Sequence, residues 1–302
     1  MNRVAAVVIN RNTRDFLRDC LASIEDQDFA GGISTWVIDN GSNDGSPEMV
    51  ISEFPSANLV WNSRNTGYAR ACNKGIELSR EPCVMIMNSD VVLRPDTVAQ
   101  LVESLDRNPG TGVVGPKVLN SDGSLQYSCR RFPSIKESFV HAFVGIFKAG
   151  NPYSESYRMM DMDRETETEV DWVSGAFMAL RRDALSDIRA FDDKYFMYVE
   201  DVDLCWRMRR AGWTVNYVPK AVAVHHIGMS GRQVPTRMVF CHHRSMLRFH
   251  RKTYEGPLRP LIHAVVAAGV AARFLLIVAL NLFYRIRAAL GGAKRVIMPG
   301  RQ

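Results

Sequence analysis

The chain has 302 residues, of which 46% are hydrophobic and 23% are charged, the proportions of a folded protein with a sizeable core. This composition excludes a disordered or fibrous chain. The six cysteines form no CxxC pair and follow no regular spacing, which argues against a zinc cluster or a disulfide framework and favours a reducing compartment. Met1-Asn2-Arg3 runs directly into an apolar stretch, so we expect no signal peptide before it.

The net charge of +6 hides an uneven distribution along the chain. Up to Asp203 there are 21 Lys and Arg against 31 Asp and Glu, whereas beyond it there are 17 against one, which is Glu255. A basic half of this kind meets an anionic partner, either nucleic acid or the phosphates of a membrane or lipid carrier. Its aromatic side chains lie within apolar runs and no nucleic-acid motif is recognisable, so we expect no nucleic acid partner.

Hydrophobic periodicity predicts alternating strands and helices in the N-terminal part of the chain. The predicted strands cover residues 4–9, 35–38, 59–61 and 83–87, and the predicted helices cover 13–25 and 68–78, with a third that begins at Ser46 and Pro47. Such alternation indicates an α/β domain built on a mainly parallel sheet.

Polar loops follow three of these strands, over residues 10–12, 39–46 and 88–90. In an open α/β sheet the ligand lies outside the carboxyl ends of the strands, so these loops are candidates for a binding site. No glycine precedes Gly31, which argues against a dinucleotide fingerprint, a P-loop and a sugar-phosphate nucleotidyltransferase.

A group of carboxylates, Glu200, Asp201 and Asp203, opens a predicted amphipathic helix whose inner face carries Val199, Val202, Cys205 and Trp206. Crowded carboxylates raise one another's pKa, whereas a helix N-terminus favours the ionised form. One of the three could therefore accept a proton near neutral pH. The alternative is the ordinary preference of helices for acids in the first turn.

The middle of the chain carries weaker signals. Residues 124–131 are expected to pair as a hairpin, and the polar, acidic and Met-rich stretch over 151–169 is expected to be a mobile or variable loop.

The C-terminal part differs in character. Residues 236–254 predict a basic amphipathic helix, and residues 261–284 are almost entirely apolar. The apolar run is long enough to span a bilayer, but Arg273 near its middle would be costly there. We therefore favour a helix that lies in the plane of the membrane, with a helix packed on the core as the alternative.

Taken in order, the motifs resemble family 2 glycosyltransferases, and more narrowly their rhamnosyltransferase branch, which includes enzymes that transfer rhamnose to polyprenyl-diphosphate-linked N-acetylglucosamine. The motifs are the strand that ends at Asn10, residues 39–45, 65–73, 88–90 and 172–176, and the stretch from Phe191-Asp192 through 200–203. The resemblance covers about residues 3–230.

The resemblance implies a GT-A fold, an α/β architecture with a Rossmann-like mixed sheet, over residues 1–232. The donor half would cover about residues 1–117 and the acceptor half about 118–232. Residues 233–302 would then form a basic, apolar, helical extension that associates with the membrane.

The resemblance also assigns a nucleotide-sugar site. Its members are Asn10, Asp39, Asn65, Gly67, Tyr68, Asn88, Asp90 and Arg232. Asp39 would accept a hydrogen bond from the ring N–H of a uracil or thymine base, residues 65–68 would surround the nucleotide, and Arg232 would close over the diphosphate.

A divalent metal, Mn²⁺ or Mg²⁺, is expected on the diphosphate. Residues 88–90 stand where the family has Asp-x-Asp, but the first position is Asn88, so only Asp90 carries charge. His225 is the expected further ligand, with His226 as its alternative, and imidazole suits manganese better than magnesium. Both histidines could instead lie on the surface near a phosphate.

For catalysis the resemblance assigns Asp201 as the base, with Glu200 as an orienting residue, although an exchange of these two roles stays open. Asp203 is expected to cap the helix. Trp172, Ser174 and Gly175 would form the floor under the acceptor sugar, although Trp172 is equally suited to a place in the core.

The resulting prediction is an inverting, metal-dependent glycosyltransferase that moves L-rhamnose from dTDP-rhamnose to a lipid-linked N-acetylglucosamine in cell-wall or surface polysaccharide synthesis. It would work at an anionic membrane surface, on the cytoplasmic face of the plasma membrane, as a peripheral or monotopic protein. An oligomer stays open. The alternatives are another nucleotide sugar or acceptor, or a catalytically silent nucleotide-sugar-binding scaffold.

Overall fold

The computed structural model describes residues 1–132, 152–226, 236–256 and 258–289. The chain forms two compact units. The first comprises the described residues of Met1–Phe132, Asp161–Phe196 and Glu200–Ser230, and the second comprises those of Pro133–Met160, Met197–Val199 and Gly231–Gln302.

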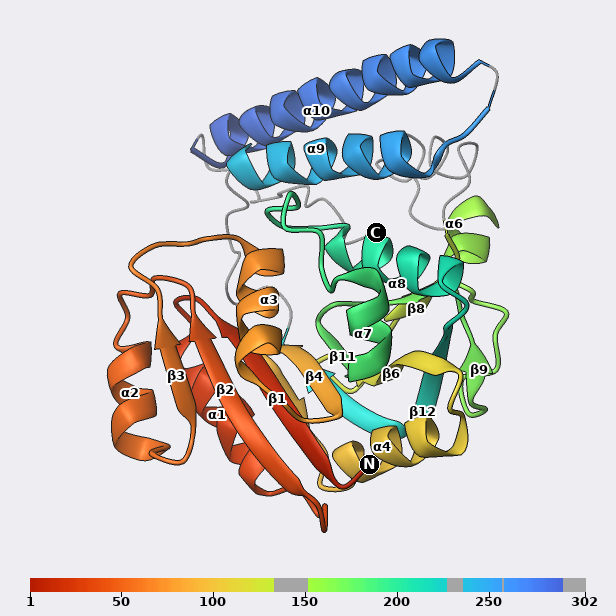
Figure 1. The fold of residues 1–302 in the computed structure, drawn as a ribbon. Coiled ribbons are helices and arrows are strands. Elements are labelled where there is room, and N and C mark those ends of the chain that lie inside the picture. The colour runs from red at the N-terminus through yellow and green to blue at the C-terminus, as the bar shows by residue number, and fades with distance from the viewer. Residues whose placement is uncertain (133–151, 227–235, 257, 290–302) are drawn as a thin grey trace. The chain divides into compact units, whose positions relative to one another are not determined.

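The first unit is built on a mixed sheet whose central strands follow the order β3-β2-β1-β4-β11-β6-β12-β5, with β7 beside β6 and β9 beside β12 (Figure 1). Its strands are β1 (Arg3–Asn10), β2 (Gly32–Asp39), β3 (Asn58–Trp61), β4 (Cys83–Asn88), β5 (Val91–Leu93), β6 (Thr111–Leu119), β7 (Leu125–Gln126), β9 (Thr168–Glu169), β11 (Phe177–Arg181) and β12 (Thr214–His225). A separate short pair joins β8 (Cys129–Arg130) to β10 (Trp172–Val173).

Helices connect these strands. They are α1 (Arg14–Glu25), α2 (Ser46–Glu53), α3 (Tyr68–Leu78), α4 (Thr97–Arg107), α7 (Arg182–Ile188) and α8 (Glu200–Arg210). The predicted alternation of strands and helices is confirmed up to β4. Strands β1 to β4 pair in parallel, but β11 runs antiparallel to both β4 and β6, so the sheet is mixed.

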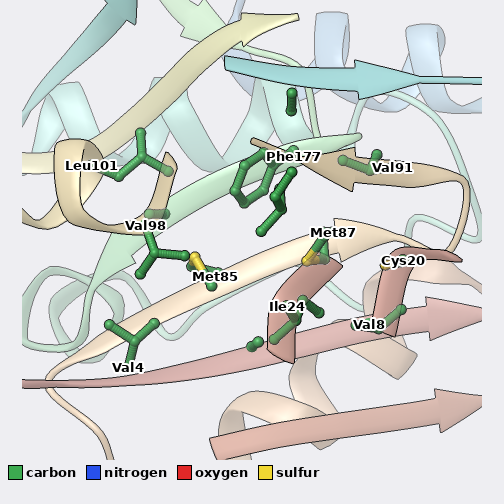
Figure 2. Packing of buried hydrophobic residues seen from close by; sticks show 14 of the residues in the cluster. Val4, Val8, Cys20, Ile24, Met85, Met87, Val91, Val98, Leu101 and Phe177 are labelled. Carbon is green, nitrogen blue, oxygen red and sulfur yellow. The ribbon is translucent and has the colours of Figure 1, made fainter. Parts of the chain in front are cut away.

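The core between α1, α4 and the sheet holds the strand ends in place. Nearly every side chain of β1 and β4 is buried, and α1 contributes Leu17, Cys20, Leu21 and Ile24 at helical spacing. Figure 2 shows Val8 and Met87 of adjacent strands in this cluster with Cys20 and Ile24 of α1. Because β1, β2 and β4 are parallel neighbours, their carboxyl ends meet at one edge of the sheet.

Two expectations for the middle of the chain were wrong. The hairpin at 124–131 does not form, because Gly123, with φ of 81°, makes the turn earlier and pairs Leu125 with Leu119. Strand β8 then pairs with β10 instead. The stretch expected to be a loop contains α6 (Pro152–Tyr157) and β9.

Helix α8 begins at Glu200, with the three expected carboxylates in its first turn, and its last turn carries Arg207, Arg209 and Arg210. Negative charge at the N-terminus and positive charge at the C-terminus both interact favourably with the helix dipole. Its buried face differs from the expected one. Val202 and Cys205 are buried, together with Leu204 and Met208, but Trp206 is only half-buried and Val199 precedes the helix.

The second unit contains α9 (Thr236–Thr253) and α10 (Arg259–Ala289), which confirm the two predicted C-terminal helices. Val239 of α9 and Ile277 of α10 form a small buried cluster, against which Phe274 and Leu280 pack. The rings of Phe240 and Phe274 also meet edge to face, 6.1 Å apart.

Candidate active site

Asn10 and Asp39 end adjacent strands in register. Asn10 Nδ2 donates to Asp39 Oδ2 over 2.7 Å, and the N–H groups of Gly41 and Ser42 donate to Asp39 Oδ1 over 3.1 and 2.8 Å. The Asp39 side chain is fully buried. In this structure Asp39 therefore shapes its own turn, and its contact with a nucleobase stays a prediction.

Asn40 ties this turn to the loop at 65–68. Its Oδ1 accepts hydrogen bonds from both the N–H and the hydroxyl of Thr66, each over 3.0 Å. Asn65 Oδ1 accepts from the Gly67 N–H over 2.9 Å. Gly67 has φ of +95°, and a Cβ there would lie 2.7 Å from the Phe196 carbonyl oxygen, so the position requires glycine.

Tyr68 begins α3 and reaches the other side of the site, because its hydroxyl donates to the Gly175 carbonyl over 2.6 Å. Burial raises the pKa of the Tyr68 phenol well above its usual value, and the charges of Glu200, Asp201 and Asp90 raise it further. All three carboxylates therefore lie within electrostatic reach of Tyr68, which links the predicted donor residues to the predicted catalytic ones.

Asp90 and His225 meet as predicted. Strand β12 runs antiparallel to β5, and this pairing brings His225 opposite Val91. His225 Nε2 lies 3.2 Å from Asp90 Oδ1, and both side chains are largely buried. Asn88, one strand away, donates its backbone N–H to the Ala176 carbonyl over 2.9 Å.

The donor set fits a divalent cation that needs further oxygen ligands. A carboxylate and an imidazole together suit manganese. Within the described ranges no group of three or more metal-ligating His, Cys, Asp or Glu side chains gathers. The remaining positions would be taken by diphosphate oxygens and water, as in sites that bind a metal with its phosphate substrate.

Asp201 is aimed at the loop that carries Gly175. Its Oδ2 accepts the Gly175 N–H over 2.8 Å, and its Oδ1 accepts the Val202 N–H over 2.9 Å. A Cβ at Gly175 would lie 3.2 Å from the Asp201 Cβ, so glycine permits this approach. Burial raises the pKa of Asp201, opposed by these two N–H groups and by the charge of Arg130.

Glu200 lies in a different environment. It is 5% exposed, and no partner among the described residues lies within hydrogen-bond distance of its Oε2. Burial, followed by the charge of Asp201, raises the pKa of Glu200 well above its usual value. Burial thus favours the protonated form of Glu200, whereas the two N–H groups at Asp201 favour its ionised form.

This difference predicts how stability depends on pH. A raised native pKa means that the folded chain binds the Glu200 proton more tightly than the unfolded chain, so this contribution to the free energy of unfolding is lost as pH rises through the native pKa. The Glu200→Gln variant has no proton to lose at this position, so this fall in the free energy of unfolding should disappear. The fall amounts to about 1.4 kcal/mol for each tenfold difference in proton affinity between the folded and unfolded chains. Urea denaturation of both proteins at about pH 5 and about pH 8 measures it. Equal destabilisation of the variant at both pH values would show an ionised, paired Glu200.

The structure gives the Asp203 side chain two partners, and its expected capping role stays a prediction. Its fully buried carboxylate accepts from Arg207 Nε over 2.7 Å and from the Tyr195 hydroxyl over 3.2 Å. An interaction with a residue four positions along the same helix braces α8 internally. Asp203 is therefore a structural residue.

Trp172 is 6% exposed, and its Nε1 donates to the Arg131 carbonyl over 3.0 Å. The Arg130 guanidinium lies 5.3 Å from the centroid of the ring. Ser174 donates its N–H to the Ser128 carbonyl over 2.7 Å. Trp172 is thus packed in the protein and covered on one side by Arg130. In the loop that follows Trp172, Gly175 lies beside Asp201.

Some site residues were missed by sequence analysis. Arg130 pairs with Trp172 across the short β8–β10 ladder and acts electrostatically on Asp201, but no motif marks it. Gln126, whose Oε1 lies 2.8 Å from His225 Nδ1, has no sequence signal either. Arg232, which was expected to close over the diphosphate, lies outside the described residues.

The chain matches the family model "Glycosyl transferase family 2" over residues 5–189. It is 34% identical over 242 residues to the N-acetylglucosaminyl-diphospho-decaprenol L-rhamnosyltransferase of Mycobacterium tuberculosis, covering 75% of this chain and 78% of that protein. It is also 28% identical over 167 residues to rhamnosyltransferase WbbL of Escherichia coli, a match that covers 55% of this chain and 60% of that protein.

Among solved structures, the mannosyltransferase PcManGT of Pyrobaculum calidifontis in complex with GDP-Man and Mn²⁺ matches with a TM-score of 0.57 at 18% identity. The match covers 96% of this chain and 76% of that one. The mixed sheet and this structural similarity show the GT-A fold. This chain belongs to glycosyltransferase family 2.

Proposed function

We propose that this glycosyltransferase moves L-rhamnose from dTDP-rhamnose to N-acetylglucosamine carried on a polyprenyl diphosphate, with inversion at the anomeric carbon. The observation that supports it most concerns Tyr68. Its hydroxyl donates to Gly175, whose N–H in turn donates to Asp201, and the charge of Asp90, the partner of His225, also reaches the Tyr68 phenol. The transferred sugar and the acceptor are those in the name of the Mycobacterium tuberculosis relative.

In this proposal Asp201 removes the proton from the acceptor hydroxyl. The freed oxygen forms a bond to the anomeric carbon, while the bond from that carbon to the nucleotide diphosphate breaks and its electron pair leaves with the diphosphate. The two N–H groups that hold Asp201 fix its direction, and its raised pKa makes it a stronger base. The protonated form that burial favours at Glu200 adds no second charge to the site.

Asp90 and His225 are the residues that would hold the metal. A bound divalent ion supplies charge that stabilises the departing diphosphate. The loops at the strand ends are held in order by their own side chains. Asp39, Asn40 and Asn65 accept backbone N–H groups of these loops, and Asn10 donates to Asp39 and so fixes its carboxylate.

In this proposal the protein works at an anionic membrane surface, on the cytoplasmic face of the plasma membrane, and the second unit has features that suit such a surface. Arg259–Phe283 is, within the described ranges, a helix long and apolar enough to cross a bilayer by length and composition. Arg273, the charged residue near the middle of this helix, points toward α9. It is 9% exposed, and its Nη1 lies 3.0 Å from His243 Nε2 on α9. His243 Nδ1 donates to the Val239 carbonyl, which leaves Nε2 to accept from Arg273.

The opposite face of α10 is exposed and apolar. It presents the large side chains Leu261, Val265, Leu275, Leu282, Phe283 and Ile286. Helix α9 beside it is rich in Arg, Lys and His. An apolar face next to basic groups is typical of a helix pair that lies in the membrane interface, which favours a monotopic arrangement over a spanning one.

Replacing two exposed leucines tests the membrane surface without disturbing the α9–α10 contact. Leu275 and Leu282 are 65% and 57% exposed, so Leu275→Gln with Leu282→Gln should leave folding intact. We expect the fraction that sediments with anionic vesicles to fall at least about tenfold, because two leucines no longer enter the lipid. The matched control is Ile51→Gln on α2, which is 61% exposed and should sediment like the parent. Unchanged sedimentation of the double variant would contradict this surface.

A catalytically silent scaffold is the second candidate, because Asn88 replaces the first carboxylate of the family's metal motif. The test incubates the protein with Mn²⁺, an acceptor lipid and a panel of nucleotide sugars, and identifies which nucleotide diphosphate is released. The proposed function predicts dTDP from dTDP-rhamnose. Binding of a nucleotide sugar without any release favours the scaffold, and release of another nucleotide changes the donor.

A further inference from the structure

His225 is held from both sides of its ring. On one side Nε2 faces Asp90 Oδ1 at 3.2 Å, and on the other Nδ1 lies 2.8 Å from Gln126 Oε1. Strand register explains the second contact. Gln126 pairs with Val118, Val118 pairs with Ala223, and Ala223 lies two residues before His225 on the same face of the sheet.

The contact between Gln126 and His225 ends a chain of hydrogen bonds. Gln126 Nε2 donates to Asn120 Oδ1 over 3.0 Å, and Asn120 Nδ2 donates to Ser124 Oγ over 2.9 Å. The Ser124 hydroxyl donates in turn to Asp122 Oδ1 over 2.6 Å. All of these residues belong to the β6–β7 turn and the strand that follows it.

The direction of this chain is set at its far end. An ionised carboxylate can only accept, so the Ser124 hydroxyl must donate to Asp122, and its oxygen is then free to accept from the Asn120 amide. Asn120 in turn presents its carbonyl oxygen to the Gln126 amide nitrogen. The Gln126 carbonyl oxygen is left facing His225, and it can only accept, so Nδ1 must carry the proton.

A neutral His225 with its proton on Nδ1 has a bare lone pair on Nε2. That lone pair faces another acceptor, the Asp90 carboxylate, at 3.2 Å. Two acceptors that face each other at this distance can serve together as ligands of one divalent cation. Two ligands at right angles on an octahedral ion, each about 2.1 Å from it, lie about 3 Å apart, which fits this spacing.

We propose that Gln126 is a positioning residue that, through the chain from Asp122, holds His225 in its Nδ1–H tautomer and so presents Nε2 beside Asp90 to a divalent cation. This inference rests on the proposed function, because it concerns the metal that function uses. It assigns a role to the β6–β7 turn, which carries no family motif.

The tautomer is tested directly in the metal-free full-length chain. Proton–nitrogen NMR of histidine labelled with nitrogen-15 in the ring, at mildly alkaline pH, shows which nitrogen carries the proton, and His225→Gln identifies the signals by their loss. We expect Nδ1–H in the parent and Nε2–H, or a mixture, in Gln126→Leu. An Nε2–H tautomer in the parent, or an unchanged Nδ1–H tautomer in Gln126→Leu, overturns the inference.

Metal affinity provides the second measurement, made by following free Mn²⁺ with electron paramagnetic resonance. Gln126→Leu should weaken Mn²⁺ binding about 10- to 100-fold. Gln126→Glu keeps an acceptor at the same distance and should bind at least as tightly as the parent. Ser121→Ala is the matched control, because Ser121 Oγ lies 2.8 Å from Nδ1 of the adjacent His226, and its Mn²⁺ affinity should be unchanged.

The outcomes separate this inference from the function on which it rests. If the parent binds Mn²⁺ and Gln126→Leu binds it within twofold, the role of Gln126 is wrong and the proposed function stands. If the parent binds no Mn²⁺ and turns over fully in a chelator, the metal-dependent function itself fails, and the inference fails with it.

Discussion

Asp201→Asn is expected to lower turnover by roughly 10²- to 10⁴-fold, the usual contribution of a general base. The amide keeps the size of the side chain and can still accept one of the two N–H groups that hold it, but it cannot take a proton from the acceptor. The dissociation constant for the donor should stay within a few-fold, because the base acts in the transition state. Steady-state kinetics and calorimetric titration with the donor measure the two quantities.

Glu200→Gln is the control for this experiment, since the two side chains are neighbours on α8. Because burial favours the protonated form of Glu200, which an amide resembles, Glu200→Gln should keep turnover within about tenfold of the parent, well short of the loss expected for a base. If Glu200→Gln instead abolishes transfer while Asp201→Asn does not, the two roles are exchanged. Lost donor affinity with unchanged turnover in Asp201→Asn would place Asp201 in the donor site.

Asp90→Ala is expected to weaken Mn²⁺-supported donor binding by roughly 100-fold, because it removes the one carboxylate of the metal pair. His225→Ala should reduce turnover with Mn²⁺ more than turnover with Mg²⁺, since imidazole is a better ligand for manganese. Donor titrations and rates with each metal measure these effects.

His226→Ala is the matched control for the metal experiment. His226 follows His225 in the chain, but its Nδ1 contacts Ser121 and its ring lies 5.6 Å from that of Phe16. Its removal should leave the preference between the two metals unchanged. Full activity of the parent in excess chelator would contradict the assignments of both Asp90 and His225.

Much of the donor half follows from local sequence. The apolar runs of β1 and β4, the helical spacing of α1, and polar residues directly after strands identify a parallel α/β unit whose loops meet at one edge. The same signals identify Asn10, Asp39 and Asp90 as neighbours. They do not show that Asp39 is fully buried, because that depends on how the Gly41–Ser42 turn folds back on it.

The acceptor half depends on contacts between distant residues, which periodicity does not encode. Arg130 reaches Trp172 through a ladder of only two residue pairs, and Gln126 reaches His225 across β6. The hairpin expected at 124–131 failed for the same reason, since Gly123 closed the turn earlier. The C-terminal helices were predicted well, but the inward direction of Arg273 required His243 as its partner on α9.

The most direct test of the account is a transfer reaction with dTDP-rhamnose and N-acetylglucosaminyl-diphospho-lipid in Mn²⁺, in which NMR determines the anomeric configuration of the product. A single displacement with Asp201 as base predicts one dTDP released per sugar transferred and an inverted anomeric centre. A product that retains the donor's configuration would contradict the account, as would dTDP release without any glycosylated lipid.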